Sequence, residues 1–126
     1  MISMGWIAAS AVLIVAGALL ALKQADSVSD EAAREYLRQG AKVIDVRSAE
    51  EYREHHVPNA VNIPVNELEQ RIGKEAPDKT AVLLLLCLSG GRSAVGVRLL
   101  KRMGYTKVFN LGSLARAEKI VGKSGK

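Results

Sequence analysis

The sequence predicts an α/β domain with a central parallel sheet, preceded by one transmembrane helix. Residues 1–22 contain no charged side chain and no histidine, so all 18 basic and 13 acidic side chains lie in residues 23–126. In this charged part, short β-rich runs alternate with helical patterns, which is typical of a parallel sheet covered by helices. Residues 81–86 (AVLLLL) are continuously apolar, as expected of a strand that is buried on both faces.

Residues 2–22 have the length of a membrane span. As a helix rising about 1.5 Å per residue they extend roughly 31 Å, and the core of a bilayer is about 30 Å thick. A cleaved signal peptide is the main alternative, and a buried soluble helix is a third. The segment lacks the basic start, the shorter apolar run and the cleavage site of a signal peptide. We expect a transmembrane helix at 1–22, a linker at 23–28 and one domain at 29–126.

The charges beside the apolar segment indicate its orientation. The positive side chains that flank it all follow it, beginning with Lys23, Arg34 and Arg38. The positive-inside rule then places the domain in the cytoplasm. The single cysteine suits a reducing compartment, and it excludes an intramolecular disulfide and any metal site with two or more thiolates. We expect a single-pass membrane protein with its domain on the cytoplasmic rather than the exported side.

Serine and glycine residues mark the elements of the first half of the domain. Ser27 or Ser29 can cap the first helix, which carries acidic residues in its first turn and can end at Gly40. Ser48 can cap a second helix, and Gly73 can end a third. We expect helices at 27–40, 48–56 and 66–72, a strand at 42–46 (KVIDV), and an extended segment at 60–63.

The second half repeats the alternation of strand and helix. Val95, Leu99 and Met103 are spaced by four residues, which places them on one face of a helix that can end at Gly104. We expect strands at 81–86 and 107–111, helices at 92–103 and 113–121, and a frayed tail at 122–126.

The two halves of the domain differ in charge. Residues 23–78 hold 8 basic and 12 acidic side chains, a net charge of −4, whereas residues 79–126 hold 10 basic and one acidic, a net charge of +9. The positive half is consistent with an ordinary solvated surface, with a field that attracts a small anionic substrate, or with an anionic membrane surface. Nucleic acid is the least favoured partner, because only 4% of the residues are aromatic and could stack on bases.

The segment Cys87-Leu-Ser-Gly-Gly-Arg92-Ser93 connects the buried strand to the following helix. Ligands of open α/β sheets gather at such carboxyl ends of strands. If Gly90 and Gly91 adopt φ > 0, the backbone N–H groups can curl into an anion cradle at a helix N-terminus. Those dipoles would favour a nucleophilic Cys87 thiolate, and Arg92 would supply a positive fork for an oxyanion. The alternative is a buried cysteine beside a glycine-rich turn.

The spacing of this loop resembles one family. Four residues separate Cys87 from Arg92. Phosphatases with a cysteinyl phosphate have five, whereas Cys-x-x-Gly-x-Arg is similar to the active-site loop of the rhodaneses, which are sulfurtransferases. The shorter loop leaves room for one sulfur atom on the cysteine. The resemblance implies that the substrate is bound by Leu88, Ser89, Gly90, Gly91, Arg92 and Ser93.

Three further segments carry the same resemblance. Ile44-Asp45-Val46-Arg47 followed by Glu51-Tyr52 is similar to the family's Asp-Val-Arg…Glu-(Phe/Tyr), residues 56–64 to its His-Ile-Pro-Gly-Ala-x-Asn-Ile-Pro, and residues 100–108 to the turn that follows the active site. They imply a three-layer rhodanese-like domain in which Asp45 and Arg47 brace the site. His55 and Asn59 stand where glycines are usual, and Asn tolerates φ > 0.

The C-terminal end departs from the common pattern. Gly112-Ser113-Leu114 replaces a glycine pair followed by Trp, which resembles the phage-shock-protein E type of single-domain rhodanese. Because those short proteins are exported, this resemblance weighs against a cytoplasmic domain.

The resemblance implies a two-step sulfur transfer. The Cys87 thiolate takes the outer sulfur of thiosulfate or a similar small anionic donor, and a thiol or cyanide acceptor then removes it. No cofactor is expected, and no metal, because the adjacent His55 and His56 lack a third ligand. The alternatives are a catalytically weak binding module tethered to the membrane, and a cysteine-dependent phosphatase or arsenate reductase.

Overall fold

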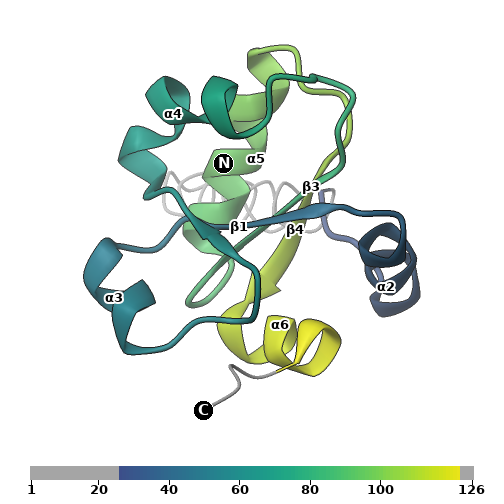
Figure 1. Cartoon of the computed structure of the whole chain (residues 1–126), viewed down its shortest axis with the longest axis vertical. Coiled ribbons are helices and arrows are strands. Elements are labelled where there is room, and N and C mark those ends of the chain that lie inside the picture. Colours follow the sequence, from purple (N-terminus) through teal and green to yellow (C-terminus); the bar gives the residue numbers. More distant parts are fainter. Residues whose placement is uncertain (1–25, 123–126) are drawn as a thin grey trace, which may run out of the picture.

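The computed structural model describes residues 26–122 and confirms the predicted α/β domain with a parallel sheet (Figure 1). The sheet has four strands in the order β2-β1-β3-β4, and every neighbouring pair is parallel. In chain order the elements are α2 (Asp30–Arg38), β1 (Lys42–Asp45), α3 (Ala49–Glu54), β2 (Val61–Asn62), the 3₁₀ helix η1 (Val65–Glu67), α4 (Leu68–Glu75), β3 (Leu83–Cys87), α5 (Gly91–Arg102), β4 (Val108–Ser113) and α6 (Leu114–Val121).

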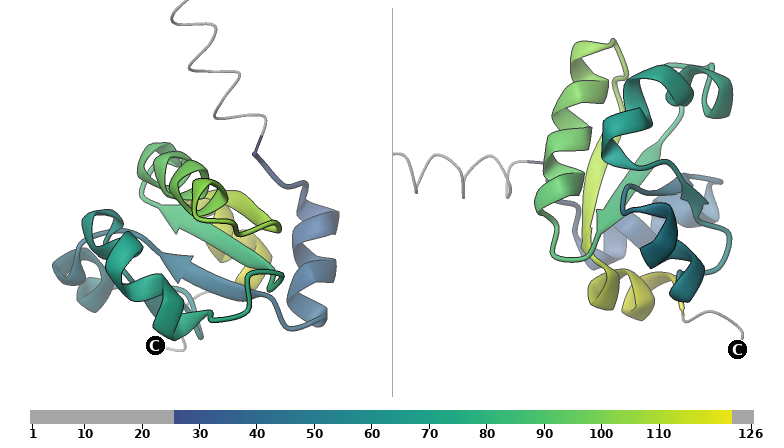
Figure 2. Two further views of the ribbon diagram at one scale, coloured as in Figure 1. Left: turned by 90° about the horizontal axis from the view of Figure 1, so that it is seen from above. Right: turned by 90° about the vertical axis from the view of Figure 1, so that its left-hand side faces the viewer.

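Helices cover both faces of the sheet, which gives three layers (Figure 2). Apolar side chains of α4 and α5, including Leu68 and Leu100, form one buried cluster with Leu85 and Cys87. The cluster on the other face includes Leu84 and Leu86 together with residues of α2 and α6. Successive residues of β3 therefore face opposite layers. All five are buried, which explains the continuous apolar run at the centre of the sheet.

Serine caps begin three of the helices, and the caps at Ser29 and Ser48 were predicted from the sequence. Ser29 accepts a hydrogen bond from Ala32 N at 3.1 Å, and Ser113 accepts one from Arg116 N at 3.1 Å. Ser48 and Glu51 form a reciprocal capping box at the start of α3. Such caps satisfy backbone N–H groups that have no partner inside the helix.

Most predicted boundaries differ from the observed ones by one to three residues, and two of the differences have a tertiary cause. α4 does not end near Gly73 but continues to Glu75, because the buried Ile72 and Ala76 anchor its last turn to the core. β4 does not end at residue 111 but extends to Ser113. Its register against β3 shifts by one residue, so that Leu85 pairs with Asn110 and Leu86 with Gly112. A bulge of this kind follows from tertiary pairing and has no local sequence signal.

The predicted transmembrane helix at 1–22 lies outside the described residues. Within residues 26–122, no helix is long and apolar enough to cross a bilayer. Residues 26–28, which fall within the predicted linker, pack against the domain: Val28 is buried, and Asn110 N donates to Asp26 O at 2.7 Å.

Candidate active site

Cys87 is the last residue of β3, and its side chain is fully buried beside the first turn of α5. Gly90 N donates a hydrogen bond to its Sγ at 2.9 Å, and the Ser93 hydroxyl lies 3.5 Å from the same atom. The sequence predicts that the loop turns donors toward the cysteine, and the backbone N–H of Gly90 does so.

The surroundings of Cys87 favour its thiolate. Burial raises the pKa of the Cys87 thiol, but hydrogen bonds from the hydroxyl and N–H of Ser93 lower it. The N–H groups of Ser89 and Gly90 lower it further, so the pKa of this thiol lies below that of an ordinary cysteine. The positive end of the α5 dipole also favours the thiolate, and no acidic residue in the first turn of α5 opposes it. Cys87 is therefore suited to act as a nucleophile.

The two glycines of the loop have different conformations. Gly90 is the N-cap of α5 and has φ +93°, which only glycine adopts without strain. Gly91 is the first helical residue, has no positive φ, and would meet no atom within 4 Å if it carried a Cβ. The expectation of a positive φ is confirmed for Gly90 and wrong for Gly91, because the helix already begins there.

Arg92 is held by Glu51, which belongs to one of the resembling segments but was given no role in the site. Its two terminal nitrogens donate to the two carboxylate oxygens of Glu51, at 2.7 and 3.0 Å. The Arg92 guanidinium and the backbone N–H of Ser48 hold the pKa of Glu51 at about 2, so the pair stays ionised at neutral pH. Hydrogen bonding to Glu51 in turn raises the pKa of Arg92. The predicted oxyanion fork is thus engaged with α3 in this structure.

Asp45 and Arg47 form a buried ion pair at the end of β1. Arg47 Nη2 donates to Asp45 Oδ2 at 2.8 Å and to His55 O at 2.7 Å. The Asn62 amide donates to the carbonyls of Asp45 and Arg47 at 3.0 and 2.9 Å, which ties β2 to the same turn. The bracing role of Asp45 and Arg47 stays a prediction, and these contacts are the ones that it requires. Asn62 belongs to one of the resembling segments, so a signal for it was present.

Asn110 is the buried polar residue beside Cys87 that the sequence analysis missed. It lies on β4, is 2% exposed, and its Oδ1 accepts from the Ser93 hydroxyl at 2.7 Å. Its Nδ2 donates to Gly90 O at 3.1 Å. Nothing in the run KVFNL distinguishes this asparagine from an ordinary strand residue, because its partners lie 17 and 20 residues away.

Comparison with known proteins identifies the family. A family model for the rhodanese-like domain matches residues 29–115. The chain belongs to the rhodanese-like family. Thiosulfate sulfurtransferase PspE of Escherichia coli is 42% identical over 71 residues, which are 56% of this chain and 68% of that protein. Human thiosulfate:glutathione sulfurtransferase is 32% identical over 105 residues, which are 73% of this chain and 91% of that protein.

The solved structures agree with this assignment. The structure of a rhodanese with anions from E. coli has a TM-score of 0.60 at 39% identity and covers 61% of this chain and 91% of that chain. These comparisons confirm the predicted rhodanese-like fold. The names of the relatives support the prediction that the chain is an enzyme of the thiosulfate sulfurtransferase type. The membrane anchor and the phage-shock-protein E type of C-terminal end stay predictions.

Leu88 and Ser89, the two residues that follow Cys87, are exposed. Leu88 is 57% exposed, and Ser89 forms a bridge with Ser113 of β4. The two histidines face different partners: His55 Nε2 contacts the Glu118 carboxylate, and His56 stacks on Tyr52 with ring centroids 3.8 Å apart. In the part of the chain that the structure describes, no three histidine, cysteine or acidic side chains lie together as metal ligands would.

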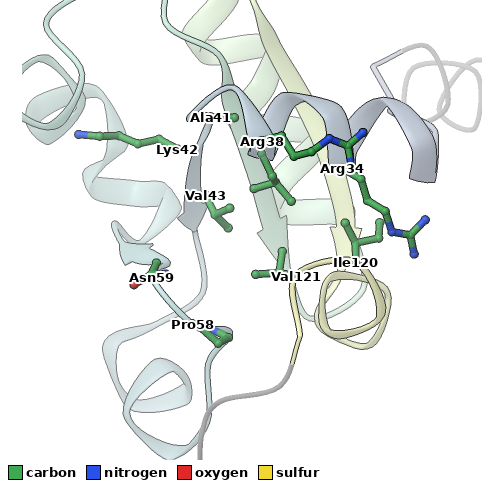
Figure 3. A pocket seen from close by; sticks show the side chains of 10 residues that line it. Arg34, Arg38, Ala41, Lys42, Val43, Pro58, Asn59, Ile120 and Val121 are labelled. Atoms are coloured by element: carbon green, nitrogen blue, oxygen red, sulfur yellow. The ribbon is translucent and has the colours of Figure 1, made fainter.

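Two of the hollows on the domain differ in their relation to the cysteine loop. One, of about 530 Å³, is bordered by α2, the start of β1 and the end of α6, and Figure 3 shows Val43, Ile120 and Val121 within it. None of the predicted site residues lines it. The other, of about 480 Å³, includes Arg92 and residues that follow β1 and β2. The second hollow is the candidate substrate site, because it meets the carboxyl edge of the sheet where ligands of α/β proteins bind.

Proposed function

We propose that this protein transfers sulfane sulfur from thiosulfate, or a similar anionic donor, to a thiophilic acceptor through a persulfide on Cys87. The observation that supports this most strongly is the convergence of hydrogen-bond donors on a buried sulfur whose pKa is lowered. A thiolate in such a position is a nucleophile, and the same donors suit the persulfide anion that follows.

The first step breaks the S–S bond of thiosulfate. The Cys87 thiolate attacks the outer sulfur, forms a new S–S bond and releases sulfite, which leaves with the electron pair of the broken bond. The products are sulfite dianion and a Cys87 persulfide anion, so the total charge of three negative units is unchanged. The buried donors stabilise the charge on the persulfide without reorganisation, which lowers the barrier.

The second step returns the enzyme to its resting state. An acceptor such as cyanide or a thiolate attacks the outer persulfide sulfur, and the Cys87 thiolate leaves. Since the chain has one cysteine, the acceptor must come from outside it, and the kinetics are ping-pong. The positive half of the domain, residues 79–126, carries the Cys87 loop and favours the approach of an anionic donor.

A thiocyanate assay tests the proposal. The full-length chain is incubated with thiosulfate and cyanide, and thiocyanate formation is measured for wild type and Cys87→Ser. We expect turnover by wild type only, and a mass increase of one sulfur atom on wild type treated with thiosulfate alone. Tyr105→Phe removes a hydrogen bond to Ala76 O away from the cysteine loop and serves as a control that keeps its activity. Absence of product from wild type would instead favour the binding-module alternative.

We further propose that residues 1–22 anchor the enzyme to a membrane, with the domain in the cytoplasm. The uncharged segment and the basic residues that follow it support this. Reporters fused to the C-terminus, one active only in the cytoplasm and one active only outside it, test the orientation. Activity of the exported reporter would overturn the cytoplasmic assignment, and loss of residues 1–22 from the mature chain would overturn the anchor.

A further inference from the structure

Asn110 lies on the same face of the sheet as the reactive cysteine. In the register of β3 against β4, Asn110 is paired with Leu85. Because alternate residues of a strand share a face, Leu85 and Cys87 both point toward α5. Asn110 therefore extends beneath the first turn of α5, and Leu111 becomes the extra residue of the bulge. In this way the bulge sets an amide below Cys87 and Ser93.

The amide of Asn110 can be oriented in one way only. The N–H of Gly112 can only donate, and it lies 2.9 Å from Oδ1. The carbonyl of Gly90 can only accept, and it lies 3.1 Å from Nδ2. Turning the amide over would set donor against donor and acceptor against acceptor, so the oxygen must face Gly112. The same oxygen lies 2.7 Å from the Ser93 hydroxyl, and Ser93 must donate to it.

The hydroxyl of Ser93 has one proton and three acceptors within reach. They are Asn110 Oδ1 at 2.7 Å, Gly90 O at 3.1 Å and Cys87 Sγ at 3.5 Å. While the proton points to Asn110, the sulfur receives only backbone donors. When the sulfur becomes an anion, a bond from this hydroxyl becomes charge-assisted, and such bonds are roughly twice as strong as neutral ones. The amide oxygen and the sulfur thus compete for one proton.

We propose that Asn110 is a positioning residue of the sulfur-transfer site. While Cys87 is neutral, Asn110 Oδ1 accepts the hydrogen bond of the Ser93 hydroxyl. When the sulfur is a thiolate or persulfide anion, the hydroxyl turns away from Asn110 and donates to the sulfur. Rotation of one O–H then follows the charge on the sulfur, and no proton leaves Ser93. Through its bond to the Gly90 carbonyl, Asn110 also anchors the turn at Gly90, whose N–H meets the sulfur. The consequence for turnover rests on the proposed sulfur transfer, whereas the competition itself is a property of the resting thiol.

The competition predicts a coupling between two substitutions. In wild type, Ser93→Ala raises the pKa of the Cys87 thiol by less than the loss of a full hydrogen bond would, because the thiolate competes with Asn110 for the Ser93 hydroxyl. In Asn110→Leu the nearest competing acceptor is gone and only Gly90 O, at 3.1 Å, still competes, so Ser93 donates to the sulfur more readily and the thiol pKa falls. Ser93→Ala should then raise the thiol pKa by about 0.7 unit more than in wild type, which corresponds to one ordinary hydrogen bond.

The pH dependence of alkylation measures this coupling directly. Because the chain has one cysteine, the rate with iodoacetamide between about pH 5 and pH 10 reports on Cys87 alone. Full-length wild type, Ser93→Ala, Asn110→Leu and the double variant are compared. The charged side chains at this end of the sheet, namely Arg92, Glu51, Asp45 and Arg47, are present in all four proteins, so their influence cancels.

Two further variants keep the test decisive. Asn110→Asp retains an oxygen that accepts from Ser93 and holds its proton more firmly, so Ser93→Ala should then change the thiol pKa less than in wild type. If Asn110→Leu does not fold, the effect of Ser93→Ala in Asn110→Asp, compared with its effect in wild type, tests the proposal by itself. Tyr105→Phe, which loses a buried hydrogen bond at the far end of α5, should leave the thiol pKa unchanged.

Additive effects would overturn the proposal. If Ser93→Ala shifts the thiol pKa by the same amount in wild type, in Asn110→Leu and in Asn110→Asp, Asn110 is only structural. Thiocyanate formation is measured on the same proteins. If the variants show the coupling but wild type forms no thiocyanate, the proposed function is refuted and the role of Asn110 stands. If wild type forms thiocyanate but the variants show no coupling, the role of Asn110 is refuted and the proposed function stands.

Discussion

The ends of β1 and β3 are neighbouring strand-to-helix turns on one edge of the sheet, yet they use polar groups in opposite ways. At the end of β1, the Asp45 carboxylate and the Arg47 guanidinium are buried and satisfy each other. At the end of β3, backbone and hydroxyl donors converge on the Cys87 sulfur, which is a weak acceptor until it becomes an anion. The polar groups of the first turn are already paired with one another, whereas the donors of the second turn would be fully used only by a charged sulfur.

One ion pair joins the two turns. Glu51, on the helix that follows β1, holds Arg92, on the helix that follows β3. The first turn thereby positions the reactive one. We expect damage to the first turn to appear mainly as lost stability, and damage to the second mainly as lost sulfur chemistry.

The largest expected effect is on stability, at the end of β1. Arg47→Leu leaves the fully buried Asp45 carboxylate without its partner, and breaking such a pair costs about 3–5 kcal/mol. Urea unfolding followed by circular dichroism measures this loss. Arg71→Leu, which removes an exposed pair with Glu67, is the matched control and should cost less than about 1 kcal/mol. Equal losses in the two variants would contradict the contrast.

The next effect separates the two glycines of the reactive turn. Gly90→Ala forces a Cβ into φ +93°, which costs roughly 1–2 kcal/mol and moves the N–H that meets the sulfur. Alkylation of Cys87 at neutral pH should slow, because the thiol pKa rises when that donor is displaced. Gly91→Ala should change stability by less than about 1 kcal/mol and leave the alkylation rate unchanged. Similar behaviour of both variants would show that the turn tolerates side chains at either position.

The smallest effect concerns the ion pair that joins the turns. The pKa of Glu51 is lowered from 4.5 to about 2, so its contribution to stability is complete above pH 4.5 and is lost as the pH falls toward 2. The stability difference between wild type and Glu51→Gln should therefore be constant near neutral pH and shrink in acid. Denaturant midpoints measured along a pH series test this. A difference between wild type and Glu51→Gln that grows in acid would reverse the assigned sign.

Interactions within a few residues of the chain were open to prediction, and long-range ones were not. The serine caps, the buried central strand, the order of helices and strands, and the positive φ of Gly90 all follow from local patterns and local sterics. The prediction of a positive φ at Gly91 was wrong because the exact residue at which a helix begins depends on its cap. Within the site, the Glu51–Arg92 pair joins residues 41 positions apart, which no local pattern reports.

The sequence by itself determined the family of this protein and the residues of its cysteine loop, and the tertiary structure decided which groups surround the sulfur. A lone cysteine, two glycines and an arginine at one spacing sufficed to indicate a rhodanese-like loop, because a tight turn into a helix N-terminus is a local property of the backbone. The proton that Ser93 can offer Cys87 depends on Asn110, which reaches the site only because β4 pairs with β3 and bulges by one residue. Strand pairing is set by the packing of the whole sheet.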